Sequence, residues 1–223
     1  MRVDPNVHCG VTEMNTAIER LGGNTAPDDV TFAPACAEIA IAADYSMVTE
    51  FGSVSNVETE VIAVLNMVTA KYEESPLQIS YDLVETYVVS CNGCDPWSTS
   101  TNASTLLSSF NGWNGFSKTY DVASLWTKRD IEESGNNGVI GLAYIGQICQ
   151  SNNHNLLEHY YQSQTGSMVD QAHELGHNWN CQHISPANTT NIMSPSIGPS
   201  NTTRCGPHNP RTPSPRIATA AIA

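Results

Sequence analysis

Apolar residues recur along this chain at two spacings, and each spacing predicts a different kind of element. From residue 38 to 44, isoleucines alternate with small residues, which is typical of a buried strand. Between 57 and 73, apolar residues recur at steps of three and four, which predicts a helix capped by Asn56. Residues 79–89 are rich in β-branched and aromatic types and predict a second strand. The remaining predicted elements are a helix at 104–110, a strand at 120–127, an edge strand at 139–148 and a helix at 167–180.

The order of these elements predicts an α/β (α+β) domain built on one mixed sheet. Residues 1–35 lack strong periodicity and contain the Gly22-Gly23-Asn24 stretch, so we expect a linker there. Residues 36–205 hold every predicted element and form the expected domain. Residues 206–223 are rich in proline and are expected to be a tail.

The net charge of the chain limits the classes of partner that it is expected to bind. Its 223 residues include 9 Lys and Arg against 22 Asp and Glu, which gives a formal net charge of −13. A field of this sign repels nucleic acid and anionic membranes, so neither is an expected partner. No apolar run reaches the ~18 residues that a membrane span needs. The oligomeric state stays open at this level.

Seven cysteines in a small acidic chain predict disulfides and an oxidising compartment. We therefore expect a secreted protein whose export signal lies upstream, because the residues after Met1 lack the apolar core of a signal peptide. Cys91 and Cys94 flank a tight turn and are predicted to pair with each other, although a C-x-x-C pair can also be redox-active or bind a metal. His154 and His159 have no ligand spacing and are expected at the surface.

One motif carries the candidate chemistry, His173-Glu174-Leu175-Gly176-His177. Residues four apart on a helix share a face, so both imidazoles can reach one ion. His183 follows six residues later and supplies a third imidazole, a ligand type that suits Zn²⁺. Glu174 is placed to take a proton from an attacking water and to pass it to a leaving amine. The pattern predicts a zinc-dependent hydrolase.

The sequence around this motif resembles a known family. Residues 171–180 resemble the zinc helix of adamalysin/reprolysin-type (ADAM-like) metzincins, while 120–127 and 141–146 resemble that family's inner strand and edge strand. Residues 38–44 resemble its first strand. The resemblance implies a metzincin catalytic domain with a twisted, mixed five-stranded sheet, long helices and a small C-terminal subdomain. It also implies hydrolysis of peptide bonds in protein or peptide substrates.

The resemblance also implies roles for individual residues. Met193 matches the Met-turn below the metal, and residues 195–197 match a wall of the substrate pocket. Glu38 and Asp121 match positions that bind a structural Ca²⁺. The edge strand would pair with the substrate backbone through Gly141, Leu142, Ala143, Tyr144 and Ile145.

Three features depart from the family pattern. Asn180 stands where the family has the glycine that ends the zinc helix, but Asn is the next-best residue for a left-handed conformation. Ile184 follows the third histidine, where the family usually has Asp. The tail after Arg204 lacks the apolar periodicity of the family's last helix.

The N-terminal residues Val7-His8-Cys9-Gly10 resemble the cysteine switch of a propeptide. In that case the thiolate of Cys9 would be a latent-state zinc ligand, and residues 1–35 would be a propeptide remnant. A Cys9–Cys36 disulfide is the alternative. The resemblance pairs Cys149 with Cys205. The function expected overall is that of a secreted zinc endopeptidase, in a latent zymogen form if Cys9 binds the zinc. A non-catalytic binding module on the same scaffold is the alternative.

Overall fold

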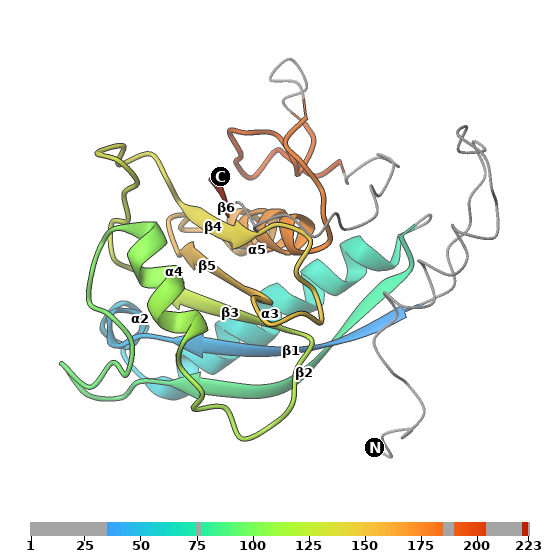
Figure 1. The fold of residues 1–223 in the computed structure, drawn as a ribbon. Helices are drawn as coiled ribbons and strands as arrows, with labels where there is room; N and C mark the ends of the chain where they lie inside the picture. Colours follow the sequence, from blue (N-terminus) through green and yellow to red (C-terminus); the bar gives the residue numbers. More distant parts are fainter. Residues whose placement is uncertain (1–34, 75–76, 185–189, 204–219, 223) are drawn as a thin grey trace, which may run out of the picture.

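The computed structural model describes residues 35–74, 77–184, 190–203 and 220–222. The chain forms one sheet with helices on both faces (Figure 1). The strands are β1 (Ala35–Ala43), β2 (Ile79–Val88), β3 (Val122–Thr127), β4 (Gly141–Tyr144), β5 (His154–Glu158) and β6 (Ala220–Ile222). The helices are α2 (Tyr45–Phe51), α3 (Val54–Glu73), α4 (Ala103–Asn111) and α5 (Gln164–Asn178).

The strand order is β2-β1-β3-β5-β4-β6. The first four of these strands are parallel, whereas β4 runs antiparallel to β5. The predicted mixed five-stranded sheet is therefore confirmed in β1 to β5. A sixth short strand, β6, adds to the outer edge of β4, also antiparallel.

Period-two alternation sends the side chains of β1 to opposite faces. Ile39, Ile41 and Ala43 pack into one core with the buried faces of α3 and α5. Ala40 and Ala42 pack into a second core with α4 and with inner residues of β3 and β5. The long helices therefore lie together on one face, and α4 covers the other (Figure 1).

A cluster of charges ties the ends of β1 and β3 together. Asp44 caps α2 and accepts hydrogen bonds from the Ser46 backbone N–H at 3.0 Å and from Thr127 Oγ1 at 2.5 Å. Arg129 lies 3.1 Å from Asp44 and 2.6 Å from Asp95. The buried Asp44 carboxylate is therefore both hydrogen-bonded and ion-paired, as a buried charge requires.

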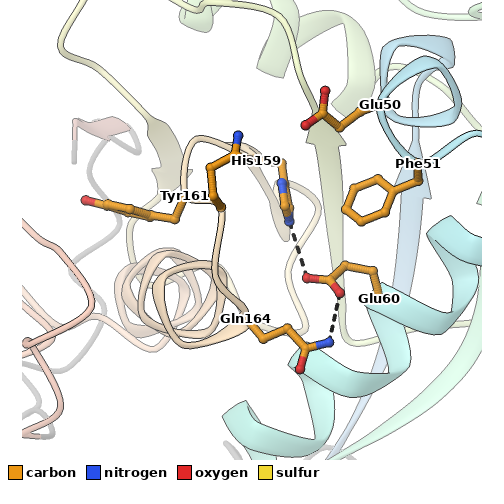
Figure 2. Close-up of a pocket in the computed structure, with 7 residues that line it drawn as sticks. Glu50, Phe51, Glu60, His159, Tyr161 and Gln164 are labelled. Carbon is orange, nitrogen blue, oxygen red and sulfur yellow. Dashed lines mark hydrogen bonds and ion pairs between the residues drawn. The ribbon is translucent and has the colours of Figure 1, made fainter.

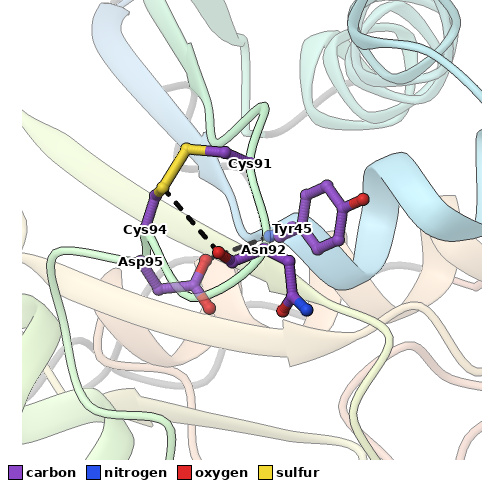
Figure 3. The surroundings of a disulfide bond; sticks show 5 residues. All are labelled: Tyr45, Cys91, Asn92, Cys94 and Asp95. Atoms are coloured by element: carbon purple, nitrogen blue, oxygen red, sulfur yellow. Dashed lines mark hydrogen bonds between the residues drawn. A yellow bond between two sulfur atoms is a disulfide. The ribbon is translucent and has the colours of Figure 1, made fainter.

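The predicted Cys91–Cys94 disulfide is confirmed, and it closes the turn that follows β2 (Figure 3). Asp95 directly follows it and accepts a hydrogen bond from the Tyr45 backbone N–H at 3.0 Å. The turn thereby anchors the start of α2 to the loop after β2.

Three predictions about the elements were wrong. Helix α3 begins at Val54 and Ser53 caps it, so Asn56 lies inside the helix and does not cap it. The strand predicted over 139–148 shortens to β4, and the chain then turns back into β5, which the sequence pattern did not predict.

His154 and His159, expected at the surface, are 3% and 6% exposed. His154 begins β5, which lies between β3 and β4, and the ring of His159 packs against Phe51 and Trp126. Within the described ranges, no helix is long and apolar enough to cross a membrane.

Candidate metal centre and active site

Helix α5 carries the His-Glu-x-x-His motif through the interior of the domain. Ser163 caps it, accepting a hydrogen bond from the Gly166 backbone N–H at 3.2 Å. Gln171 pins the helix to the sheet, because it accepts from Trp126 Nε1 at 2.7 Å and donates to Ser124 Oγ at 3.0 Å. His173, Glu174 and His177 are all 0% exposed. The helix is thus held rigidly at the positions that carry the candidate chemistry.

The end of α5 turns the chain back towards the motif. Asn180 adopts the left-handed conformation with φ 69°, as the sequence predicted. Its N–H donates to the carbonyl of His177 at 2.8 Å, and the N–H of Cys181 donates to the carbonyl of Gly176 at 2.8 Å. This pair of bonds is a Schellman motif, which ends a helix and reverses the chain. The reversal brings His183 back over the helix.

The structure brings the three predicted histidine ligands together. The Nε2 atoms lie 3.0 Å apart for His173 and His177, 3.1 Å for His173 and His183, and 3.2 Å for His177 and His183. Among the described residues, these three form the one group of at least three metal-ligating side chains whose ligand atoms converge.

The hydrogen bonds of the two helical histidines select the tautomer that a metal requires. Nδ1 of His173 lies 2.6 Å from the carbonyl oxygen of Ile192, and Nδ1 of His177 lies 2.8 Å from that of Cys181. A carbonyl only accepts, so each Nδ1 carries the proton and each Nε2 presents a lone pair. Converging lone pairs repel one another unless a cation lies between them.

The spacing of these nitrogens also fits zinc. A tetrahedral site with Zn–N distances of about 2.0–2.1 Å places neighbouring ligand nitrogens about 3.3 Å apart. The observed separations of 3.0–3.2 Å are close to this value. Burial lowers the pKa of His177 to about 4 and lowers the pKa of His173 and His183 as well. The imidazoles are therefore neutral near pH 7, which is the form that binds a metal.

Glu174 lies in a space that Gly141 of β4 leaves empty. A Cβ atom on Gly141 would lie 2.7 Å from Cδ of Glu174 and nearer still to Oε1. Neither carboxylate oxygen of Glu174 has a hydrogen-bond partner among the described residues. Burial raises the pKa of Glu174 well above its ordinary value, and the charge of Asp170 raises it further. The carboxyl group is thus buried and available for proton transfer.

Asp170 and Glu158 extend this group into a line of buried carboxyls that the sequence analysis missed. Asp170 lies one turn before Glu174 on α5, and burial and Glu158 together raise its pKa well above its ordinary value. Burial also raises the pKa of Glu158 to about 7. The four-residue spacing could have identified Asp170. Glu158 ends β5, a strand that the pattern did not reveal.

Met193 lies directly beneath the motif. A Cβ atom on Gly176 would clash with its Sδ and lie 3.2 Å from its Cε. The Ile184 N–H donates to the carbonyl of Met193 at 3.0 Å, which ties the loop carrying His183 to this turn. Residues 195–197 follow, and Tyr161 Oη donates a hydrogen bond to the carbonyl of Ile197.

The candidate substrate strand lies alongside α5. Asn178 Nδ2 donates to the carbonyl of Tyr144 at 3.0 Å, and the Gly146 N–H donates to the carbonyl of His177 at 2.8 Å. Of the five residues predicted to bind substrate, Gly141 to Tyr144 form β4, whereas Ile145 lies just beyond the strand. These bonds fix the strand relative to the histidines.

The predicted calcium residues have other contacts. Asp121 Oδ2 accepts a hydrogen bond from the Glu38 backbone N–H at 2.9 Å, and the Asp121 N–H donates to the Glu38 carbonyl at 2.8 Å. These bonds link β1 to the start of β3. The calcium site stays a prediction.

The described cysteines leave the role of Cys9 open. Cys36 carries a free thiol in β1, but the Cys9–Cys36 disulfide stays untested because Cys9 lies outside the described residues. Cys149 is disulfide-bonded, but Cys205, its predicted partner, lies outside the described residues. Cys9 also lies outside them, so the cysteine switch is untested.

A separate cavity of about 170 Å³ lies between α2, α3 and the start of α5 (Figure 2). His159 points into it, with Nε2 3.4 Å from Glu60 Oε1 and 3.0 Å from Ser167 Oγ. Both contacts use the same nitrogen, whereas a serine–histidine–acid relay needs one at each ring nitrogen. The printed contacts of His159 therefore do not form such a relay.

Comparison with known proteins agrees with this geometry. A reprolysin-type family model described as "Metallo-peptidase family M12" matches residues 34–215. The fold is similar to archaemetzincin from Methanopyrus kandleri, with a TM-score of 0.50, 15% identity and coverage of 80% of this chain and 88% of that one. It is also similar to a chain in a chaperone–substrate complex, with a TM-score of 0.54 and 14% identity over 72% of this chain. This chain spans only 26% of the length of that second protein.

Proposed function

Because this chain belongs to metallopeptidase family M12, we propose that it is a zinc-dependent endopeptidase acting on protein or peptide substrates. The observation that carries the proposal is the convergence of three neutral imidazoles beside a buried carboxyl group. His173, His177 and His183 would hold the ion, and Glu174 would act as the general base. A bound Zn²⁺ supplies a more acidic water and polarises the scissile carbonyl.

Other groups of the chain orient the histidines and transfer the proton. The carbonyls of Ile192 and Cys181 hold the imidazoles of His173 and His177 in the binding tautomer. A carboxylate oxygen of Glu174 accepts the proton of the attacking water and returns it to the leaving amine. Its burial keeps bulk water away from that proton.

The substrate is proposed to bind as an added strand along β4. Gly141 adjoins Glu174, so a peptide paired with β4 passes directly beside the general base. Backbone pairing would give affinity without regard to side chains. Residues 195–197, which follow Met193, are proposed to line the pocket for the side chain after the scissile bond.

A chelator-sensitive cleavage assay on a peptide library tests this function. The wild-type chain should cleave, lose activity with a chelator and regain it with Zn²⁺. Glu174→Gln should retain zinc and the fold but lose at least about 10³-fold in kcat/KM, because the base is absent. Glu73→Gln makes the same chemical change at an exposed position and should leave activity intact. Zinc binding without cleavage in any form of the chain would instead favour a binding module.

Three finer features are also proposed. Secretion is supported by the disulfide chemistry of Cys91, Cys94 and Cys149. Latency through Cys9 predicts that Cys9→Ser, or removal of residues 1–30, raises activity. A calcium site at Glu38 and Asp121 predicts that Ca²⁺ raises the melting temperature of the zinc-loaded protein and that Asp121→Asn abolishes this effect.

A further inference from the structure

The strand β6 lies on the edge of β4 that the proposed function assigns to the substrate. Ala220 pairs with Tyr144, Ala221 with Ala143, and Ile222 with Leu142, all antiparallel. Figure 1 shows β6 beside β4, on the side of the sheet away from β5. Three of the five residues proposed to bind substrate are therefore already paired with another part of the same chain.

This occupant and a substrate strand cannot be bound together. A strand has two hydrogen-bonding edges, and β5 occupies the other edge of β4 through Gly141, Leu142 and Ala143. β6 also runs towards the candidate active site. Ile222 is opposite Leu142, the neighbour of Gly141, against which Glu174 lies.

We infer that Ala220–Ile222 is a tethered competitor that regulates access of peptide substrates to β4. This inference rests on the proposed function, since it concerns the same edge. The segment pairs with β4 through the backbone of only three residues, so a free peptide of this length would bind β4 weakly. The covalent tether offsets this weakness, because it keeps the segment at an effective concentration on the order of millimolar. A substrate with a longer matching strand can displace it.

A competitor of this kind raises the apparent KM and leaves kcat unchanged. While β6 is paired, substrate cannot bind, so the apparent KM rises. Once a substrate has displaced β6, the histidines and Glu174 are unchanged, so kcat is unchanged. A strand needed only for stability would behave differently, because its loss would lower the melting temperature and kcat together.

The test uses the full chain with the double substitution Ala220→Pro/Ala221→Pro. Successive residues of a strand direct their N–H groups to opposite sides, so two adjacent prolines remove a donor to β4 in either register. We expect KM for an extended peptide to fall roughly tenfold, with kcat unchanged. The matched variant Ala220→Ser/Ala221→Ser keeps both N–H groups and should behave as wild type. An unchanged KM in the proline variant would overturn the inference.

Two further measurements do not depend on how the variant folds. A synthetic peptide of residues 216–223 should inhibit the wild-type chain competitively, whereas a peptide with the two prolines should not. Backbone amide exchange within Leu142–Tyr144 should be slow in the wild type and at least about tenfold faster in the proline variant. Equal potency of the two peptides, or equal exchange, would contradict the inference.

Failure of the proposed function would be recognised separately. If no form of the chain cleaves peptides, the competition is measured by binding a labelled extended peptide to chains that carry Glu174→Gln. Roughly tenfold tighter binding by the proline variant than by the serine variant would support the tethered competitor even then. Equal binding would refute it, whatever the catalytic outcome.

Discussion

Replacing Gly141 by alanine should sharply lower activity, although it substitutes neither a metal ligand nor the general base. The new Cβ would lie 2.7 Å from Cδ and 3.0 Å from Cγ of Glu174. Carbon atoms in ordinary contact are about 3.5–4.0 Å apart, so the carboxyl group must move by about 1 Å. Both residues are buried in regular elements, Gly141 in β4 and Glu174 in α5. The side chain of Glu174 therefore has little room to move away.

A displacement of this size has a predictable effect on catalysis. Misplacing a reacting group by about 1 Å can lower the rate about 10²-fold, which corresponds to ~2.7 kcal/mol in the activation free energy. Overpacking a buried position should also lower the free energy of unfolding by about 1–3 kcal/mol. We therefore expect kcat to fall about 100-fold while the three histidines still hold zinc.

The assay compares kcat, zinc content and urea denaturation for Gly141→Ala and for Gly112→Ala. At Gly112 an added Cβ would make only ordinary contacts of 3.6 Å, so that variant should behave as wild type. Glu174→Asp shortens the base by one methylene and should relieve the clash. In the double variant, the loss of folding free energy should therefore be smaller than the sum of the two single losses. Full activity in Gly141→Ala, or strictly additive losses, would refute this account of the site.

Three other perturbations follow from the same structure. Asn180→Val should lower the free energy of unfolding by roughly 1–2 kcal/mol, because a β-branched residue is strained at a φ of 69°, and titration should show weaker zinc binding through the displaced His183. Glu158 has a folded-state pKa of about 7 against an ordinary 4.5, so its stabilisation is complete below pH 4.5 and is lost as the pH rises to 7. Urea denaturation should therefore show Glu158→Gln equal to wild type at pH 4 and up to about 3 kcal/mol more stable at pH 8. Removing zinc should lower the melting temperature, by the equivalent of about 4 kcal/mol if the wild type was held at 1,000 times its Kd, and His183→Ala should lose this response.

The sequence predicted those elements whose pattern of apolar residues matches the side chains that the fold buries. Helix α3 was predicted because its apolar residues face one core at helical spacing. β5 was missed because its sequence, His-Asn-Leu-Leu-Glu, has no β-branched residue and keeps polar groups in the interior. Those groups are stabilised by partners far away in the chain. Asn155 Nδ2, for example, donates to Asn178 Oδ1 at 2.7 Å.

In the candidate site too, local features were predicted from the sequence, whereas features that depend on packing were not. The three histidines and Asn180 were predicted because the ligand spacing and the left-handed break are local properties of one segment. The roles of Gly141 and Asp170 were not predicted in physical terms. Gly141 matters through the side chain of another element, and Asp170 matters through its burial beside Glu174 and Glu158. Neither relation exists until the sheet and α5 have packed together.

The same edge of β4 is proposed to bind the substrate and is paired with β6. An edge that receives a peptide backbone cannot carry the charges or prolines by which proteins usually block edge-to-edge aggregation. The sequence Gly-Leu-Ala-Tyr of β4 carries none of them. Such an edge is prone to pair with other chains when no substrate is present, and a cover that protects it must be weak enough to leave. Ala220–Ile222 fits this description, because it pairs through the backbone over only three residues and is tethered to the same chain. We therefore expect the Ala220→Pro/Ala221→Pro variant to aggregate faster than wild type as well as to bind peptides more tightly.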